Sequence, residues 1–394
     1  MMKELIKITA FLCSCLFGLT MCASKEVHHE EPDIVKPVLD GKYDWERERK
    51  SIPTSSDMVL LYGGGQHRRP FTWDKERLEP YVVYKDEEGR EHWMFDSFLM
   101  IEFMDYNCQF ITGFHKPSAR KEDWMRLANY YFSKDEQLGA LDKLIGEVMQ
   151  RLGKPAYKHR IVIAMPEPIR NADADEDSSE TLYWGADKSG KRLDFANDED
   201  RVAACRWYVD YVRKKFNEMK YKNLELGGFY WVAETAQHSS TILKKVSNYI
   251  NKYKYSFNWI PYFRAPGYKD WKSYGYHFAY HQPNYFFYDV PLSRLDQACE
   301  DAKLYGMDLE FEFDNRAMSY LDNADRSFAK KMNAYMEAFK RNGVWQNKRL
   351  AYYEGGNAVY QFSISRDVHD QILYHKFCHF VVDRPYRTID AKKD

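Results

Sequence analysis

Residues 306–316 read GMDLEFEFDNR, and acidic and apolar side chains alternate along this stretch. The acids are Asp308, Glu310, Glu312 and Asp314, and the apolar residues between them are Leu309, Phe311 and Phe313. A period of two predicts a β-strand, because successive side chains of a strand point to opposite faces. One face of this strand therefore carries four carboxylates, and the surroundings of that face decide what the carboxylates do.

The stretch is one of eight β-rich runs, and amphipathic helical patterns separate most of them. The runs are 58–64, 95–103, 160–167, 227–234, 257–263, 276–282, 307–313 and 349–355. Apolar residues recur three and four positions apart over 138–152 and 202–216, and Asn197 and Ser239 stand where helix caps are expected. Strand–helix alternation predicts a parallel sheet, and eight repeats predict a single (β/α)8 TIM barrel with long βα loops.

Two further segments refine this fold. Residues 80–95 predict a β-hairpin inserted after the first strand. We expect YGGGQ (62–66) to be a flexible strand end. The alternative fold is a doubly wound open sheet, but no glycine-rich dinucleotide or phosphate loop follows any predicted strand.

In a barrel, both faces of strand 307–313 are covered. We expect its apolar side chains to contact the surrounding helices, so the four acids must face the barrel interior. Asp308 would lie lowest, where pairing with Arg or Lys is expected because buried like charges need compensation. Glu312 and Asp314 would lie nearest the mouth, where chemistry is done.

The first 22 residues have the layout of an export signal. Lysines precede an apolar stretch at 8–21, which is short for a membrane span. The segment resembles a bacterial lipoprotein signal with a lipobox at 19–22, and this implies lipidation of Cys22. We then expect a charged tether over 23–49, a barrel domain over 50–394, and a monomeric outer-membrane lipoprotein on the cell-surface or periplasmic face, held to the membrane by its lipid alone. Plain secretion or a periplasmic location is the alternative.

Charge and cysteine content exclude several classes of partner. Lys and Arg (58) nearly balance Asp and Glu (59), so no basic field would attract nucleic acid. Cys108, Cys205, Cys299 and Cys378 show no CxxC spacing, which argues against a zinc site or a redox dithiol. We expect no cofactor and no metal.

Polar residues gather at the carboxyl ends of the predicted strands, where barrel enzymes build their active sites. The candidate substrate-binding residues are Tyr62, Gln66, Glu102, Glu167, Trp231, Tyr262, His281, Gln282, Asn284, Glu310, Asp314 and Glu354. Carboxylates, amides and aromatic rings together indicate a polar ligand, and we expect a carbohydrate.

Glu234 ends the fourth strand and Glu312 ends the seventh, and two carboxylates across a barrel mouth are the working parts of a glycosidase. The pattern resembles barrel glycoside hydrolases that carry their acid/base on strand four and their nucleophile on strand seven. This resemblance implies that Glu234 is the acid/base, that Glu312 is the nucleophile or base, and that a poly- or oligosaccharide is cleaved with retention. Ala233 stands where those enzymes usually have Asn, and Asp314 or Glu310 could replace Glu312.

Three motifs extend the resemblance to most of the chain. VLLYGGG (59–65), WVAET (231–235) and DLEFEFD (308–314), together with the lipoprotein start, are similar to an uncharacterised domain-of-unknown-function family of Bacteroidetes lipoproteins over residues 50–394. This resemblance implies a barrel-shaped, hydrolase-like protein with a role connected to glycans.

Two other functions stay open at the level of the sequence. A non-catalytic glycan-binding barrel would use the same aromatic and amide side chains without a matched pair of acids. A metal-dependent hydrolase would use the carboxylates and His281 as ligands, but the His-x-His or Asp-His spacing usual near strand one is missing.

Overall fold

The computed structural model describes residues 45–68, 71–170 and 183–390, which fold around a closed barrel of parallel strands. The strands are β1 (Asp57–Tyr62), β4 (Ser97–Ile101), β5 (His159–Met165), β8 (Leu224–Trp231), β9 (Ser256–Trp259), β10 (Phe278–His281), β11 (Asp308–Glu312) and β12 (Leu350–Tyr353). Each pairs in parallel with the next, and β12 closes the ring against β1. The predicted TIM barrel is confirmed, while the signal segment and Cys22 lie outside the described residues.

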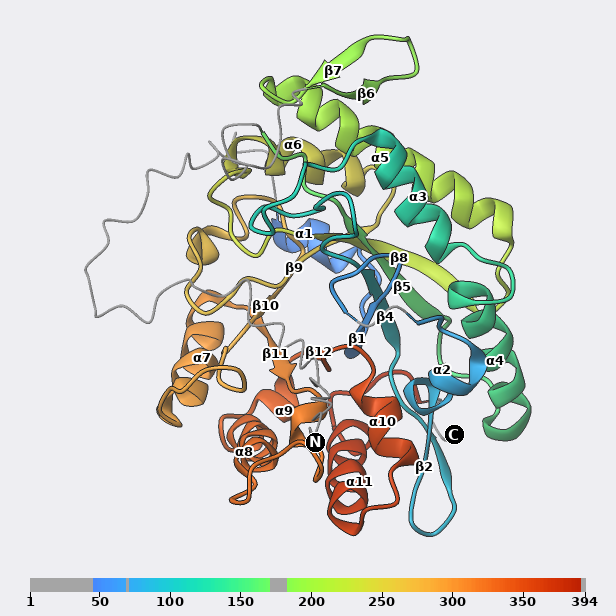
Figure 1. The fold of residues 1–394 in the computed structure, drawn as a ribbon, viewed down its shortest axis with the longest axis vertical. Helices are drawn as coiled ribbons and strands as arrows, with labels where there is room; N and C mark the ends of the chain where they lie inside the picture. The colour runs from blue at the N-terminus through green and yellow to red at the C-terminus, as the bar shows by residue number, and fades with distance from the viewer. Residues whose placement is uncertain (1–44, 69–70, 171–182, 391–394) are drawn as a thin grey trace, which may run out of the picture.

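Helices surround this barrel (Figure 1). They are α1 (Trp45–Lys50), α2 (Lys75–Val82), α3 (Lys121–Tyr131), α4 (Gln137–Leu152), α5 (Asp198–Met219), α6 (Ser240–Asn251), α7 (Ser293–Tyr305), α8 (Ser327–Arg341), α9 (Val344–Asn347), α10 (Ala358–Ile364) and α11 (Val368–Val382). Between β9 and β10 the chain forms a loop with the short 3-10 helix η2 (Tyr268–Asp270), and a second, η3 (Asn315–Ala317), follows β11. None of the described helices is both long and apolar enough to cross a bilayer.

Two antiparallel hairpins extend the barrel. β2 (Val83–Lys85) and β3 (Glu91–Trp93) form the hairpin predicted for 80–95. A second hairpin, β6 (Tyr183–Ala186) with β7 (Arg192–Asp194), lies in the connection from β5 to α5 and projects from the body of the molecule (Figure 1). Helix α1 starts at Trp45, within the segment expected to be a tether.

Alternation along β11 orients its side chains as predicted. Leu309, Phe311 and Phe313 are fully buried in the core between barrel and helices. A separate apolar cluster fills the barrel interior with side chains of the other parity, among them Leu60, Leu99, Val162, Tyr230, Ile260 and Phe278. These apolar side chains fill the lower lumen, and Glu310 and Glu312 face the interior closer to the mouth.

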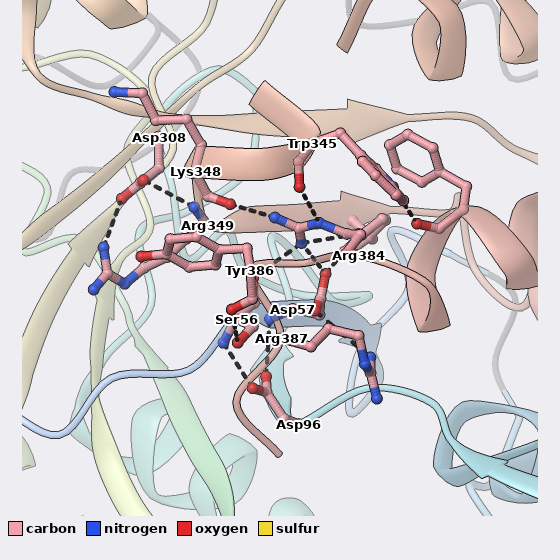
Figure 2. Close-up of polar contacts among 12 residues, drawn as sticks. Ser56, Asp57, Asp96, Asp308, Trp345, Lys348, Arg349, Arg384, Tyr386 and Arg387 are labelled. Carbon is pink, nitrogen blue, oxygen red and sulfur yellow. Dashed lines mark hydrogen bonds and ion pairs between the residues drawn. The ribbon is translucent and has the colours of Figure 1, made fainter. Parts of the chain in front are cut away.

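The amino-terminal end of the barrel is closed by a charged network (Figure 2). Asp57 and Arg384 form an ion pair with both side chains fully buried, and the hydroxyl of Tyr352 donates to Asp57 Oδ1 at 2.7 Å. Asp308 accepts from the backbone N–H of Arg349 at 3.0 Å, and the Arg349 guanidinium lies 3.7 Å from its carboxylate. The expected structural pairing of Asp308 with arginine is confirmed.

Hydrogen bonds of two side chains, Asn197 and Arg201, hold the start of helix α5 in place. Asn197 caps it, because its side chain accepts from the N–H of Glu199 at 2.9 Å, as predicted. Ser239 stands at the N-cap of α6 without capping it, since its hydroxyl contacts Arg201 Nη2 at 3.2 Å instead. Buried Arg201 also donates to the carbonyls of Pro168 and His238, so one side chain ties the loops after β5 and β8 together.

Candidate active site

Three glutamates share the mouth of the barrel. Glu234 follows β8, and Glu310 and Glu312 lie on β11, with β9 and β10 between these two strands in the ring. The carboxyl groups of Glu310 and Glu312 repel each other, and both also repel Glu234. Like charges held together in a buried site favour protonated forms, so this cluster retains protons at neutral pH.

Glu312 is buried and held by three hydrogen-bond donors. The hydroxyl of Tyr335 donates to Oε2 at 2.5 Å, the backbone N–H of Asn284 donates to Oε2 at 2.6 Å, and Asn284 Nδ2 donates to Oε1 at 3.2 Å. Burial raises the pKa of Glu312 to about 7, and the three donors act in the opposite direction. Donors aimed at both oxygens fix the carboxylate and favour its ionised form.

Glu234 is half-buried and has one donor. Gln282 Nε2 donates to Glu234 Oε1 at 2.9 Å, and its amide oxygen accepts from Asn284 Nδ2 at 2.8 Å. Burial raises the pKa of Glu234 to about 7, with Gln282 and Arg68 lowering it in part. The side-chain amides of Gln282 and Asn284 thus form a chain of hydrogen bonds between Glu234 and Glu312, the two residues predicted from the sequence to be catalytic.

Glu310 lies one inward position below Glu312 on β11 and has no hydrogen-bond donor among the described residues. Burial, followed by repulsion from Glu312, raises its pKa well above the ordinary value. A protonated Glu310 beneath an ionised Glu312 limits the negative charge held in the lumen.

Tyrosines and one arginine complete the mouth. The Arg68 guanidinium lies 5.2 Å from the ring centroids of both Tyr62 and Tyr353, and it donates to the Tyr353 hydroxyl. Burial raises the pKa of the half-buried Tyr288 hydroxyl, and the negative charges of Glu234 and Glu312 raise it further. Burial and then the charge of Glu234 likewise raise the pKa of the half-buried Tyr262 hydroxyl.

Three candidate residues prove to face away from the mouth. Trp231 is fully buried in the core between barrel and helices, which rules out the expected contact with a ligand. His281 is also fully buried, stacked at 10° on Tyr268, and burial lowers its pKa to about 4. Glu354 accepts from Tyr81 and from the N–H of Val359, so it stabilises the packing of α2 and α10. Each residue is adjacent in sequence to one whose side chain points into the barrel, so its own side chain points to the opposite face.

Other candidates hold loops together. Glu167 accepts from the N–H and hydroxyl of Thr112, at 2.9 and 3.0 Å. Asp314 caps η3 and pairs with Arg316 at 2.9 Å. Gln66 bonds through its N–H to the Met104 carbonyl, at 2.8 Å.

Glu102 lines a cavity of about 390 Å³ beside the mouth. The other lining residues are Tyr62, Gly63, Gly64, Gly65, Arg68, Phe71, Thr72 and Tyr130. Tyr62 and Arg68 line this cavity and also interact electrostatically with Glu234 at the mouth.

Sequence reasoning missed Arg68, Tyr288 and Tyr335 as site residues. Tyr335 lies on α8 among apolar residues spaced for a core, and only its hydroxyl distinguishes it from the neighbouring phenylalanines. The described part of the chain contains no group of three or more His, Cys, Asp or Glu side chains arranged to hold a metal ion. Its four cysteines are free and buried.

Comparison with known proteins finds no significant match among curated sequences. Similar solved structures include a GH18 chitinase from Flavobacterium johnsoniae, with 10% identity and a TM-score of 0.42 over 82% of this chain and 94% of that one. An endocellulase from Pyrococcus horikoshii shows 12% identity and a TM-score of 0.41, over 83% and 93%. A tryptophan synthase α-subunit from Pyrococcus furiosus shows 10% identity and a TM-score of 0.36, over 84% and 100%. Similarity this low transfers no substrate or mechanism to this chain.

A family model matches much more of the sequence. It is described as "Domain of unknown function (DUF4855)" and covers residues 57–379, from the first residue of β1 into α11. The resemblance to an uncharacterised domain family is therefore confirmed, while the lipoprotein character stays a prediction. The chain belongs to the DUF4855 family.

Proposed function

We propose that this protein is a glycoside hydrolase that cleaves a poly- or oligosaccharide with Glu234 and Glu312. The observation that supports this most directly is the unequal setting of two carboxyl groups across one barrel mouth. Glu312 is buried under three donors, whereas Glu234 is half-buried with one. Glycosidases need such a difference, because one carboxyl must donate a proton while the other is ionised.

In the first step the ionised Glu312 attacks the anomeric carbon. The bond from that carbon to the glycosidic oxygen breaks, and the leaving alcohol takes the proton of Glu234. In the second step ionised Glu234 removes a proton from water, the water oxygen attacks the anomeric carbon, and Glu312 is released as a carboxylate. A pKa near 7 suits Glu234 to both roles at neutral pH.

The test is release of reducing sugar from a broad polysaccharide and oligosaccharide panel. We expect wild-type protein to cleave at least one member, and Glu312→Gln and Glu234→Gln each to lower kcat by about 10²–10⁴-fold. Glu300→Gln, at an exposed position of α7, is the matched control and should leave kcat unchanged. If all four proteins bind a glycan and none releases sugar, the proposal of a hydrolase is wrong and the protein is a glycan-binding barrel.

A further inference from the structure

The glycines of the first strand end bring the backbone against two polar side chains. A Cβ added at Gly63 would lie 2.6 Å from the Tyr130 hydroxyl, and one at Gly65 would lie 2.4 Å from Cγ of Glu102. Gly64 has a φ of +92°, which a side chain would strain. YGGG is therefore a closely packed wall of the cavity of about 390 Å³, and the prediction of a simple flexible strand end misses this role.

Glu102 is 2% exposed, and only one of its two carboxylate oxygens accepts hydrogen bonds from described residues. Its Oε1 accepts from the N–H groups of Phe103 at 2.8 Å and of Met104 and His67 at 3.3 Å each. Its Oε2 has no hydrogen-bond partner among the described residues, although the side chain lines the cavity. A carboxylate oxygen in a cavity without a partner is an acceptor prepared for a ligand hydroxyl.

Arg68 supplies the complementary donor. It lines the same cavity, and its buried Nε has no hydrogen-bond partner among the described residues. Cation–π contacts with Tyr62 and Tyr353 hold the guanidinium in place. An acceptor and a donor on one cavity suit a polyhydroxylated ligand, because adjacent sugar hydroxyls can donate to one and accept from the other.

Building on the proposed function, we propose that this cavity is the subsite for one neutral monosaccharide unit of the substrate, with sugar hydroxyls bridging Glu102 Oε2 and the Arg68 guanidinium. The volume lies toward the lower end of the roughly 300–1,000 Å³ usual for ligand sites, which suits a short unit better than an extended chain. A uronic acid is disfavoured, because its carboxylate would face Glu102 in the cavity and Glu234 across Tyr62.

Binding of free sugars to the full chain tests this subsite. The probes are D-glucose, D-galactose, D-mannose, L-fucose and N-acetyl-D-glucosamine, with D-glucuronate as the acidic comparison, titrated by ligand-observed NMR. We expect at least one neutral sugar to bind the wild type and to bind Glu102→Gln about tenfold more weakly. Glu122→Gln, at an exposed position of α3, is the control and should bind as the wild type does.

Thr72→Val is a second variant, which removes a lining hydroxyl while keeping the side-chain shape, and should weaken binding several-fold even if Glu102→Gln folds poorly. The subsite is overturned if no neutral sugar binds, if both variants bind as the wild type does, or if glucuronate binds more tightly than every neutral sugar. Two outcomes separate the subsite from the proposed hydrolysis. If sugar binding depends on Glu102 but no protein shows turnover, the proposed hydrolysis is contradicted and the subsite is not. If the enzyme turns over substrate and Glu102→Gln leaves KM unchanged, the subsite is contradicted and the hydrolysis is not.

Discussion

Glu234 and Glu312 are the same type of residue, and the barrel gives their carboxyl groups different partners. Tyr335 and Asn284 donate to Glu312, whereas Gln282 donates to Glu234. Burial raises the pKa of both groups to about 7, so the local donors decide which group ionises first. In the proposed reaction, neighbouring residues rather than glutamate itself therefore decide which of the two groups acts as the nucleophile.

Tyr335→Phe tests this assignment at a single atom. The Tyr335 hydroxyl lowers the pKa of Glu312, so its removal should raise that pKa above about 7. Because the nucleophile must be ionised, the acid limb of the kcat/KM profile should move to higher pH, by up to about one unit. The measurement is a pH–rate profile on the best substrate of the panel, with exposed Tyr320→Phe as the control. A uniform loss of rate with an unmoved acid limb would show a packing role only.

At the scale of single elements, strand parity separates the candidate residues that face the barrel interior from those that face the helices. Tyr62, Gln282 and Glu234 stand in phase with inward side chains of their strands, whereas Trp231 and His281 are one position out of phase. Along 307–313, alternating charge makes the period of two visible in the sequence. In the apolar and aromatic strands no charge marks the inner face, so a position near a strand end does not by itself predict which side chain faces the mouth.

Helix α5 contributes to the mouth through Arg201, which joins the loops after β5 and β8. We expect Arg201→Met to lower the free energy of unfolding by roughly 2–4 kcal/mol, because the carbonyls of Pro168 and His238 lose a buried donor. Urea denaturation measures this. Arg206→Met, at an exposed position of the same helix, is the control and should change the free energy of unfolding by less than about 0.5 kcal/mol. Equal effects of the two substitutions would contradict the role of Arg201.

At the scale of the whole molecule, the segment after α11 closes the barrel from below. Arg384 pairs with Asp57 at the start of β1, and Arg387 donates to the carbonyls of Trp93 and Met94 before β4 (Figure 2 shows both arginines near Asp57). Residues more than 300 positions apart in sequence therefore meet at one end of the barrel.

Asp57→Asn should destabilise the whole barrel. The substitution keeps the shape and leaves the fully buried Arg384 without its counter-charge, which costs about 3–5 kcal/mol. Guanidinium denaturation should show one cooperative transition at a lower midpoint with an unchanged slope. Asp390→Asn removes an exposed partner of Arg387 and should cost less than about 1 kcal/mol. A loss as small for Asp57→Asn would show that the network does not hold the barrel closed.

The sequence by itself determined the barrel, the inward direction of Glu310 and Glu312 and the pairing of Asp308, because local periodicity and the need to compensate buried charge leave few alternatives. Asp314 lies beyond the end of β11 and caps η3 instead. Tertiary structure decided everything that depends on which distant side chains meet. Tyr335 reaches Glu312 from a helix, and Gln282 reaches Glu234 from the end of another strand. Three glycines let the end of the first strand pack closely against Tyr130 and Glu102. Such contacts are set by the closure of the ring and by register between strands, which no short stretch of sequence contains.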